Sequence, residues 1–212
     1  MAGPLDREFF ARPTVQVARD LLGCRLVVDH GTASEVVATL VEVEAYLGTE
    51  DPASHAFRGP TPRARIMFEA PGHLYVYLSY GVHNCANLVT ESHGVAGAVL
   101  LRAAEVEVGE AVVRERRASY PRGAAVGAPA RVIPVHELLR GPGNLCRGLG
   151  VDRTDNGLDV CSAASRFEVW QPVQRGRVAV ARGPRVGISA ATERPLRFAL
   201  RGHPAVSSPP LP

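Results

Sequence analysis

The chain has 212 residues, of which 46% are hydrophobic and 21% are charged, proportions typical of one globular domain with a sizeable core. No apolar stretch approaches the roughly 20 residues that span a bilayer, and the opening "MAGPLDREFF" carries charges where a secretion signal would be apolar. We therefore expect a cytoplasmic protein that is neither secreted nor bound to a membrane.

All 24 basic residues are arginines, and the net charge is only +3. Arginine binds phosphate in bidentate fashion, so the basic residues are compatible with a nucleic-acid surface, and equally with a solvated one. Because the chain has no lysine, an imine could form only at the terminal amine, which excludes lysine-based lyase chemistry. The cysteines show no CxxC pair or zinc-site spacing, so we expect four buried thiols without disulfides or structural metal: Cys24, Cys85, Cys146 and Cys161.

The first part of the chain predicts a helix and a β-hairpin. The helix covers residues 15–22 and stops at Gly23. Segments 24–29 and 35–46 are rich in β-branched residues and flank a short polar turn, which is typical of a hairpin. Residues 45–64 are dense in Gly, Pro, Ser and charge and predict a loop. Loops of that length inside a compact domain are usually functional or disordered.

A second hairpin is predicted over residues 72–90, with Tyr80 and Gly81 at or near its tip. The remaining predicted elements, in chain order, are a strand at 97–104, a helix at 105–118, an irregular link at 118–134, short helical pieces at 135–140 and 143–151, strands at 167–171, 177–181 and 185–189, and an irregular tail at 203–212. Residues 1–12 and 207–212 are expected to be irregular tails of a single domain spanning residues 1–212. The predicted class is α+β, with an antiparallel or mixed curved sheet flanked by helices.

A strand period of two places Glu42, Glu44 and Tyr46 on one face of their strand. The opposite face carries Val41, Val43 and Ala45. Two interpretations stay open: the acids line the solvated face of an edge strand, or a carboxylate beside an aromatic ring forms part of a functional site.

Four of the five tyrosines fall in two neighbouring predicted hairpins, at Tyr46, Tyr75, Tyr77 and Tyr80. Aromatic residues are good strand formers and usually pack in cores, the interpretation we give Tyr75. Tyr46 and Tyr77 could instead sandwich a planar heterocycle, because stacking on aromatic rings is a common way to hold an unpaired base. Tyr80, at a hairpin tip, could wedge into a duplex where a base has left.

These residues lie within motifs that together resemble the alkyladenine DNA glycosylase family, also called 3-methyladenine or N-methylpurine DNA glycosylases. The motifs are "VEVEAYLG" with "SHAF", "TPRARIMFEAPGHLYVYLSYGVHNCANLV", "AVLLRA", "GPGNLCRGLGV", and "PRVGISAA" with "PLRFALRG". The resemblance spans residues 14 to about 206, and the stretch 41–102 is highly specific. It implies a compact single-domain α+β fold with a tyrosine-bearing β-hairpin that inserts into DNA.

The resemblance implies a monofunctional DNA glycosylase of base excision repair. Such an enzyme flips a damaged purine out of double-stranded DNA and hydrolyses its N-glycosidic bond, leaving an abasic site, without metal or cofactor. The expected lesions are 3-methyladenine, 7-methylguanine and hypoxanthine, with ethenoadenine as a further candidate. A monomer with access to DNA in the bacterial nucleoid is expected.

Carried over by position, the resemblance implies that Glu44 is the general base that activates water and that Arg102 helps to hold this water. It implies that Tyr80 intercalates and fills the place that the base vacates. Four positions match residues that line the pocket of the flipped base: Tyr46, His55, Tyr77 and Asn87. Of these, Asn87 matches the residue that shapes the pocket so that normal guanine is excluded. A carboxylate fits this chemistry, because breaking the bond develops positive charge on the sugar.

Two positions depart from the family pattern. Asn84 stands where an aromatic residue is common, and Asn144 stands where a lysine often lies near the DNA backbone. The first affects the wedge or pocket. The second would weaken phosphate binding, unless nearby Arg140 and Arg147 offset it.

Other interpretations of the same residues stay open. His55 could be a loop histidine without a role, and Arg102 could emerge into solvent or pair with Glu105. The same aromatic pocket could serve a noncatalytic DNA-lesion-binding module. A metal-dependent nuclease would use acidic and histidine ligands in the loop, although their irregular spacing matches no defined ligand motif: Glu44, Glu50, Asp51 and His55.

Overall fold

A computed structural model gives the fold and describes residues 3–118, 132–173, 179–209 and 211. In these ranges the helices are α1 (Arg7–Phe10), α2 (Thr14–Asp20), α3 (Glu110–Ala118) and α4 (Pro142–Leu149). The strands are β1 (Arg25–Val28), β2 (Val36–Tyr46), β3 (Leu74–Ser79), β4 (His83–Val89), β5 (Ala98–Val108), β6 (Leu139–Arg140), β7 (Phe167–Trp170), β8 (Val180–Gly183) and β9 (Arg197–Leu200). Short 3-10 helices are η1 (Gly48–Glu50), η2 (Arg65–Phe68), η3 (Val135–Glu137) and η4 (Arg153–Asp155). Most of the predicted link at 118–134 lies outside the described residues.

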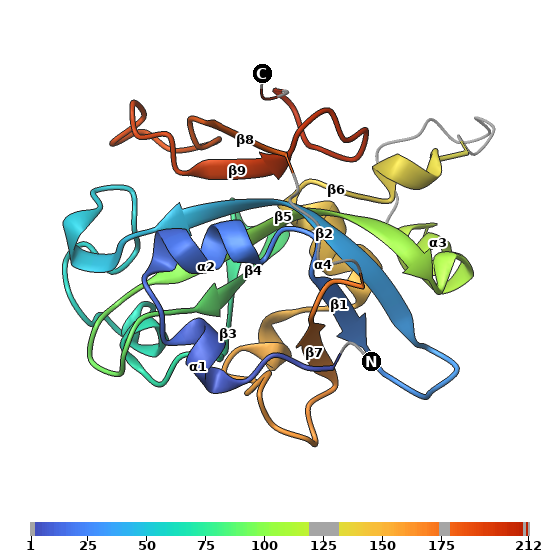
Figure 1. Cartoon of the computed structure of the whole chain (residues 1–212), viewed down its shortest axis with the longest axis horizontal. Helices are drawn as coiled ribbons and strands as arrows, with labels where there is room; N and C mark the ends of the chain where they lie inside the picture. The colour runs from blue at the N-terminus through green and yellow to red at the C-terminus, as the bar shows by residue number, and fades with distance from the viewer. Residues whose placement is uncertain (1–2, 119–131, 174–178, 210, 212) are drawn as a thin grey trace.

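The described strands form one sheet, whose pairings are all antiparallel. The main order is β3-β4-β5-β2-β1-β7, with β6 paired to β5, and β9 paired to both β2 and β8. Figure 1 shows β8 and β9 running above β2, with α1 and α2 below it in the view. The predicted α+β class with an antiparallel sheet is confirmed, and both predicted hairpins are present.

The main hydrophobic core packs α2 and α4 with the sheet. Fully buried members from different parts of the chain include Phe10, Leu21, Leu101, Leu145 and Phe167. Complete burial of such a side chain contributes about 1.5–3 kcal/mol. Cys24, Cys85 and Cys146 are buried as predicted, whereas Cys161 is half-buried. No helix of the described residues is long and apolar enough to cross a membrane.

Local signals explain where α4 begins and ends. Pro142 occupies its first turn, where a missing N–H leaves no unmet hydrogen bond. Gly150 follows its last turn with φ +67°, a left-handed conformation that glycine adopts without strain. The predicted helical piece at 143–151 is therefore confirmed to within two residues.

The predicted helix at 105–118 is wrong in its first part. β5 continues to Val108, and α3 begins at Glu110 after Gly109, whose φ is +81°. Glu105 pairs with Thr39 of β2, so the alternation of acids and valines after Ala104 is a strand pattern. The helical period starts only after the glycine.

Other predicted elements also differ from the structure. Residues 135–140 form η3 and the short strand β6, and residues 185–189 are not a strand. The side chain of Arg185 and the N–H of Val186 are engaged in other contacts instead of a ladder. The predicted strand at 177–181 begins outside the described residues and is observed as β8.

The ends of the chain are more ordered than expected. Residues 1–12, expected to be irregular, include α1, whose first turn is capped by the Asp6 side chain and whose Phe10 is fully buried. The tail after residue 203 has no helix or strand among its described residues, yet Ala205 and Ser207 are buried.

The pairing of β2 with β5 is irregular near the middle of both strands. Its register shifts between Leu40 and Val43, next to the predicted polar row. Leu40, Val43 and Ala45 join the main core, as the period of two requires for Val43 and Ala45. Val41 instead packs in a separate cluster with Ala103, so its predicted place opposite the acids is wrong. Irregularities of this kind re-aim side chains and are common near active sites.

Candidate active site

A cleft of about 750 Å³ opens where the end of β2, the β3–β4 hairpin and the first turn of α4 meet. The segments 141–144 and 186–190 complete its walls. Six predicted site residues line it: Tyr46, His55, Tyr77, Tyr80, Asn87 and Arg102. Glu44 is fully buried and hydrogen-bonded to the hydroxyl of Tyr46, directly behind the cleft wall. The structure thus brings all seven predicted residues together.

Glu44 accepts two hydrogen bonds and forms one ion pair. The Tyr46 hydroxyl donates to Oε2 over 2.9 Å, and the Val186 N–H donates to Oε1 over 2.8 Å. Nη1 of Arg102 lies 3.1 Å from the same Oε1. Burial raises the pKa of Glu44 above its ordinary value, although Arg102 and the two hydrogen bonds oppose the rise. The carboxyl group is therefore close to protein donors but easier to protonate than an exposed glutamate.

Glu42 stands two residues earlier and is also fully buried. Nε of Arg102 and Nε of Arg197 each donate to its Oε1 over 2.7 Å. The backbone N–H of Ser207 donates to Oε2 over 2.6 Å, and the Ser207 hydroxyl donates to Oε1 over 2.9 Å. Burial alone would raise the pKa of Glu42, but Arg102, the Ser207 amide and Arg197 hold this pKa below its ordinary value.

The solvated-edge interpretation of this row is wrong. β2 is an inner strand, because β5 pairs with one side of it and β1 and β9 pair with the other. Arg102 likewise does not emerge into solvent at the end of an apolar strand. It is buried, and its ion pairs are with Glu42 and Glu44, whereas Glu105 contacts His203.

Tyr46 forms one wall of the cleft, and a buried ion pair lies behind its ring. The guanidinium carbon of Arg185 is 4.6 Å from the ring centroid. Arg185 makes a bidentate ion pair with Asp51, with Nη2 2.8 Å from Oδ1, and also donates to the carbonyl oxygen of Ala45. Because Asp51 also accepts from the Leu47 N–H, this pair ties the segment before Val186 to the loop after β2.

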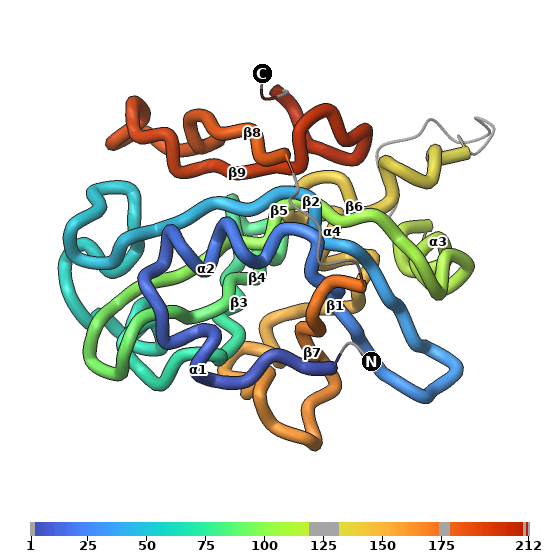
Figure 2. Tube along the Cα trace, viewed as in Figure 1, coloured from blue at the N-terminus to red at the C-terminus, as the bar shows by residue number. Residues whose placement is uncertain are grey.

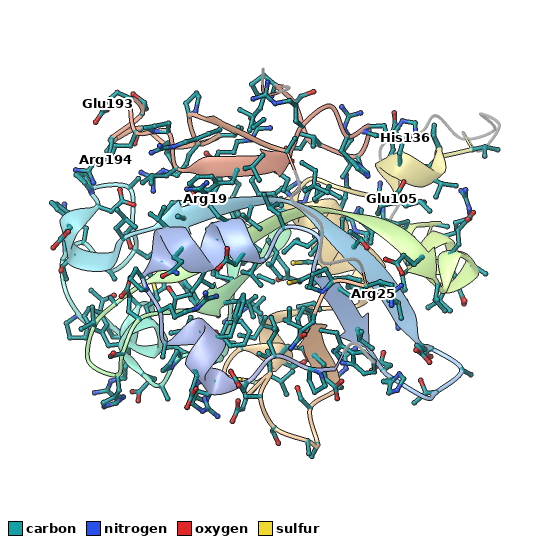
Figure 3. The ribbon with its side chains drawn as sticks, in the orientation of Figure 1. Arg19, Arg25, Glu105, His136, Glu193 and Arg194 are labelled. Atoms are coloured by element: carbon teal, nitrogen blue, oxygen red, sulfur yellow. The ribbon has the colours of Figure 1, made fainter. Side chains whose placement is uncertain are left out.

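That loop is held in place by further contacts. Gly48 has φ +60°, and a Cβ there would lie 2.0 Å from the Ala96 carbonyl oxygen, so the close approach requires glycine. Arg194 donates to the carbonyl oxygen of Glu50 over 3.0 Å. Figure 3 shows Arg194 and Glu193 on the loop that leads into β9, above the segment after β2. The two loops that flank Glu44 and Tyr46 are therefore fastened to each other.

Three further aromatic rings, those of His55, Tyr75 and Tyr77, gather in the lining of the cleft. The His55 ring meets the Tyr77 ring edge-on with centroids 4.6 Å apart, and its Nδ1 lies 2.9 Å from the Tyr75 hydroxyl. Burial against these rings, with Arg63 nearby, lowers the pKa of His55 to about 4, so the imidazole is neutral at neutral pH. His55 is thus not a solitary loop histidine, and Tyr75 does more than fill the core. Arg63, which the sequence did not single out, lies with its guanidinium carbon 4.9 Å from the Tyr77 centroid.

Asn87 forms the floor beside these rings. It is 4% exposed, and its side-chain amide donates to the Tyr75 carbonyl oxygen over 3.0 Å. Strand pairing places it opposite Tyr75 on one side and Leu100 on the other. The amide is therefore fixed by the hairpin that carries the aromatic wall.

Tyr80 occupies the tip of that hairpin. It is 87% exposed and has φ +49°, an uncommon conformation for a bulky residue. Gly81 follows with φ +70°, and the Val82 N–H donates to the Ser79 carbonyl oxygen over 3.0 Å, as in the tight turns that connect hairpins. The turn presents a large ring to solvent at the rim of the cleft.

The two departures from the family pattern lie at or near the same rim. Asn84 pairs with Leu78 in the hairpin, and Asn144 lines the cleft while donating to the Arg140 carbonyl oxygen over 2.8 Å. Arg140 in turn donates from Nε to the carbonyl oxygen of Val206. Gly143 packs so closely on the His83 ring that a Cβ would lie 2.9 Å from it. α4 and the hairpin thus meet at this rim.

The metal interpretation finds no support in the described residues, in which no group of three or more His, Cys, Asp or Glu side chains could hold a metal ion. Two of the four considered ligands are paired with arginines, Glu44 with Arg102 and Asp51 with Arg185.

Several site residues were not found from the sequence. Arg185 and Val186 fall in "PRVGISAA" and Arg197 falls in "PLRFALRG", two motifs of the resemblance that assigned none of them a role, whereas Ser207 lies in no motif. Their roles depend on contacts across more than 100 residues of sequence, which no local pattern reveals.

Comparison with known proteins identifies the family. A family model described as "Methylpurine-DNA glycosylase (MPG)" matches residues 8–204. A protein from Methanocella arvoryzae is 42% identical over 206 residues, 96% of this chain and 95% of its own. Proteins from a Mycobacterium species and from Corynebacterium jeikeium are each 44% identical, over 90% and 94% of this chain and 86% and 90% of their own. All three are named "Putative 3-methyladenine DNA glycosylase". The chain therefore belongs to the methylpurine-DNA glycosylase family, and as an enzyme it is a DNA glycosylase of DNA repair.

Proposed function

We propose that this enzyme flips damaged purines out of double-stranded DNA and hydrolyses their N-glycosidic bond with a water that Glu44 activates. The observation that carries the proposal is the position of Glu44, a buried carboxylate with two hydrogen-bond donors and an ion pair to Arg102, behind a cleft lined by aromatic rings. Expected substrates are 3-methyladenine, 7-methylguanine and hypoxanthine, with ethenoadenine as a further candidate.

The proposed step balances without a cofactor. Water attacks C1′ of the sugar while Glu44 takes its proton, and the electron pair of the C1′–N9 bond leaves with the purine. A cationic purine such as 7-methylguanine leaves as a neutral base, whereas a neutral purine such as hypoxanthine leaves as an anion that takes up a proton from solvent. The ionised carboxylate also stabilises the positive charge that develops on the sugar. The product is an abasic site, and the absence of lysine supports a reaction that stops there.

Arg102 supports the step by holding Glu44. Of the five N–H groups of its guanidinium, one at Nε donates to Glu42 and one at Nη2 donates to Ser207, while Nη1 lies 3.1 Å from Glu44. Since Arg102 also lines the cleft, the remaining donors are available to the attacking water.

The aromatic walls suit a flipped purine. The rings of Tyr46 and Tyr77 both line the cleft, and stacking on such rings is worth about 1–3 kcal/mol per base. A cationic alkylated purine gains further cation–π attraction. Neutral His55 and the fixed amide of Asn87 offer hydrogen-bonding groups without an added charge. Tyr80, exposed at the hairpin tip, would fill the vacated place in the duplex.

The test is a panel of duplexes, each with one damaged purine, incubated with the protein in excess chelator. Released base and strand cleavage are scored separately. We expect base release without direct strand cleavage, and we expect Glu44→Gln to abolish the release.

Each rival function predicts another result. Tight lesion binding without any released base would favour a noncatalytic binding module. Activity that disappears in chelator would indicate a metal-dependent nuclease, and full base release by Glu44→Gln would refute the proposed base.

A further inference from the structure

Four charged side chains form a buried cluster behind the cleft. The cluster consists of Glu42, Glu44, Arg102 and Arg197, of which three are fully buried and Arg102 has a side-chain exposure of 6%. Two carboxylates and two guanidinium groups balance in formal charge. Buried charges are tolerated only when they are paired and hydrogen-bonded, so the cluster depends on each of its contacts.

Ser207 contacts three members of this cluster. Its N–H and hydroxyl both donate to Glu42, over 2.6 and 2.9 Å. Its hydroxyl oxygen accepts from Nη2 of Arg102 over 2.9 Å, and its carbonyl oxygen accepts from Nη2 of Arg197 over 2.8 Å. Ser207 is 6% exposed and does not line the cleft, so these contacts face inward.

The segment that carries Ser207 is anchored on the sheet. Ala205 and Val206 pack with Val41 and Ala103 at the irregular pairing of β2 and β5. Arg140 donates from Nε to the carbonyl oxygen of Val206 over 2.9 Å. Figure 2 shows the chain after β9 turning back beside β6. These contacts therefore hold the hydroxyl of Ser207 in a fixed position.

We propose that Ser207 and Glu42 are positioning residues for the glycosylase reaction, which act by fixing Arg102 and, through it, Glu44. This inference rests on the proposed function. Glu42 holds Nε of Arg102 at 2.7 Å, and Ser207 holds Nη2 at 2.9 Å. Because a guanidinium group is planar and rigid, these two anchors determine where Nη1 lies.

The third nitrogen, Nη1, then meets Glu44 at 3.1 Å. When the Ser207 hydroxyl is removed, the guanidinium keeps its anchor at Nε but can swing about it. A shift of about 1 Å at a reacting group can cost about 100-fold in rate. Loss of one of two anchors should cost less, and we expect a decrease of about tenfold.

The test measures single-turnover base release from duplexes with one damaged purine, beside binding of the same DNA. Ser207→Ala removes the hydroxyl, and Ser207→Cys keeps the shape but only a weak hydrogen-bonding group. Ser207→Thr keeps the hydroxyl. Thr90→Ala is the matched control, because Thr90 is fully buried, bonds the Thr14 hydroxyl over 2.9 Å and does not line the cleft.

We expect about tenfold slower release by Ser207→Ala and Ser207→Cys, unchanged lesion binding, and recovery in Ser207→Thr. Thr90→Ala should lose about as much thermal stability as Ser207→Ala but keep the wild-type rate of base release. Wild-type rates in both Ser207→Ala and Ser207→Cys would overturn the inference but leave the proposed function intact, and so would an equal loss of rate in Thr90→Ala. No base release by the wild-type protein would overturn the proposed function and this inference with it.

Discussion

Glu42 and Glu44 lie two residues apart on β2 and carry the same kind of side chain in opposite circumstances; with Tyr46 they form the polar row of this strand. Glu42 accepts from two arginines and from both the N–H and the hydroxyl of Ser207. Glu44 pairs with one of those arginines, Arg102, and accepts hydrogen bonds from Tyr46 and Val186. Both carboxylates are fully buried. Burial prevails at Glu44, whose pKa is raised, and the donors prevail at Glu42, whose pKa is lowered.

This difference supports the proposed roles, in which Glu44 is the base and Glu42, two residues away, holds Arg102. A carboxylate with a full set of charged donors stays ionised and contributes to stability. One with fewer charged donors keeps its affinity for a proton, as a general base must. The balance between burial and the charged donors around each acid separates the two roles.

The largest expected effect comes from Glu44→Gln. Loss of a general base typically costs 10²–10⁴-fold, and here the carboxylate also supports charge on the sugar, so we expect base release to fall by about 10³-fold or more. Because burial disfavours the ionised Glu44, the variant should be at least as stable as the wild type at neutral pH. Single-turnover kinetics and thermal unfolding measure the two effects, and a destabilised Glu44→Gln variant would contradict the comparison.

Glu42→Gln should lower stability and should also slow base release, because Glu42 anchors Nε of Arg102. It leaves Arg197 without its carboxylate partner in a fully buried place, and removal of one partner of a buried ion pair costs about 3–5 kcal/mol. Urea unfolding at neutral pH measures the loss. A loss below about 1 kcal/mol would show that the four donors to Glu42 are not what stabilises the cluster.

The pH dependence of stability should have opposite signs at the two carboxylates. The pKa of Glu44 is higher in the folded than in the unfolded chain. Its contribution to stability is therefore fully present below its pKa in the unfolded chain, and is lost as the pH rises through its pKa in the folded chain. The pKa of Glu42 is lower in the folded than in the unfolded chain, so its contribution to stability is present above its pKa in the unfolded chain and is lost as the pH falls through its pKa in the folded chain. From acidic to neutral pH, the stability of Glu44→Gln relative to wild type should therefore rise, and that of Glu42→Gln should fall.

The rate of base release should rise with pH through the folded pKa of Glu44, above the ordinary range for a glutamate. The charged and titratable groups that contact Glu44 or interact with its charge are Glu42 and Tyr46 on its own strand, Cys85 on β4, Arg102 on β5 and Arg185 before Val186. A pH series of single-turnover rates tests this, and a rate that is flat from pH 4 upward would argue against Glu44 as the base.

A change outside the polar row separates binding from chemistry. Tyr80 is exposed at a strained turn, so Tyr80→Ala should leave the fold stable. Loss of one stacked ring should weaken lesion binding about tenfold. The measurement compares the affinity for lesion DNA of two inactive variants, Glu44→Gln alone and Glu44→Gln combined with Tyr80→Ala. Equal affinities would show that Tyr80 does not act as the proposed wedge.

The smallest expected effect is that of Tyr46→Phe. It keeps the ring that lines the cleft but removes the hydroxyl that donates to Glu44 over 2.9 Å. We expect a few-fold slower release near neutral pH and a rate profile shifted to higher pH, because the hydrogen bond favours the ionised carboxylate. An unshifted profile would show that the hydroxyl does not tune Glu44.

Local patterns predicted much of this arrangement. The period of two placed Glu44 and Tyr46 on one face, and the tyrosine-rich hairpin supplied Tyr77 and the exposed Tyr80. The same period could not show that β2 is an inner strand, because its neighbours include β9, more than 150 residues later. The irregular register that moves Val41 away from Val43, and the donors Arg185, Arg197 and Ser207, arise from tertiary contacts alone.

The distance along the chain between Glu42 and Ser207 has a consequence for biosynthesis. The hydrogen bonds that join them span 165 residues, so they cannot form on the ribosome until nearly all of the site has already emerged. Until then Glu42 lacks two of its four hydrogen bonds and Arg102 lacks one of its three partners, so burying them would be costly. We therefore expect the centre of β2 to stay hydrated in the nascent chain, and the enzyme to gain its glycosylase activity in one late step, after residue 207 has been made.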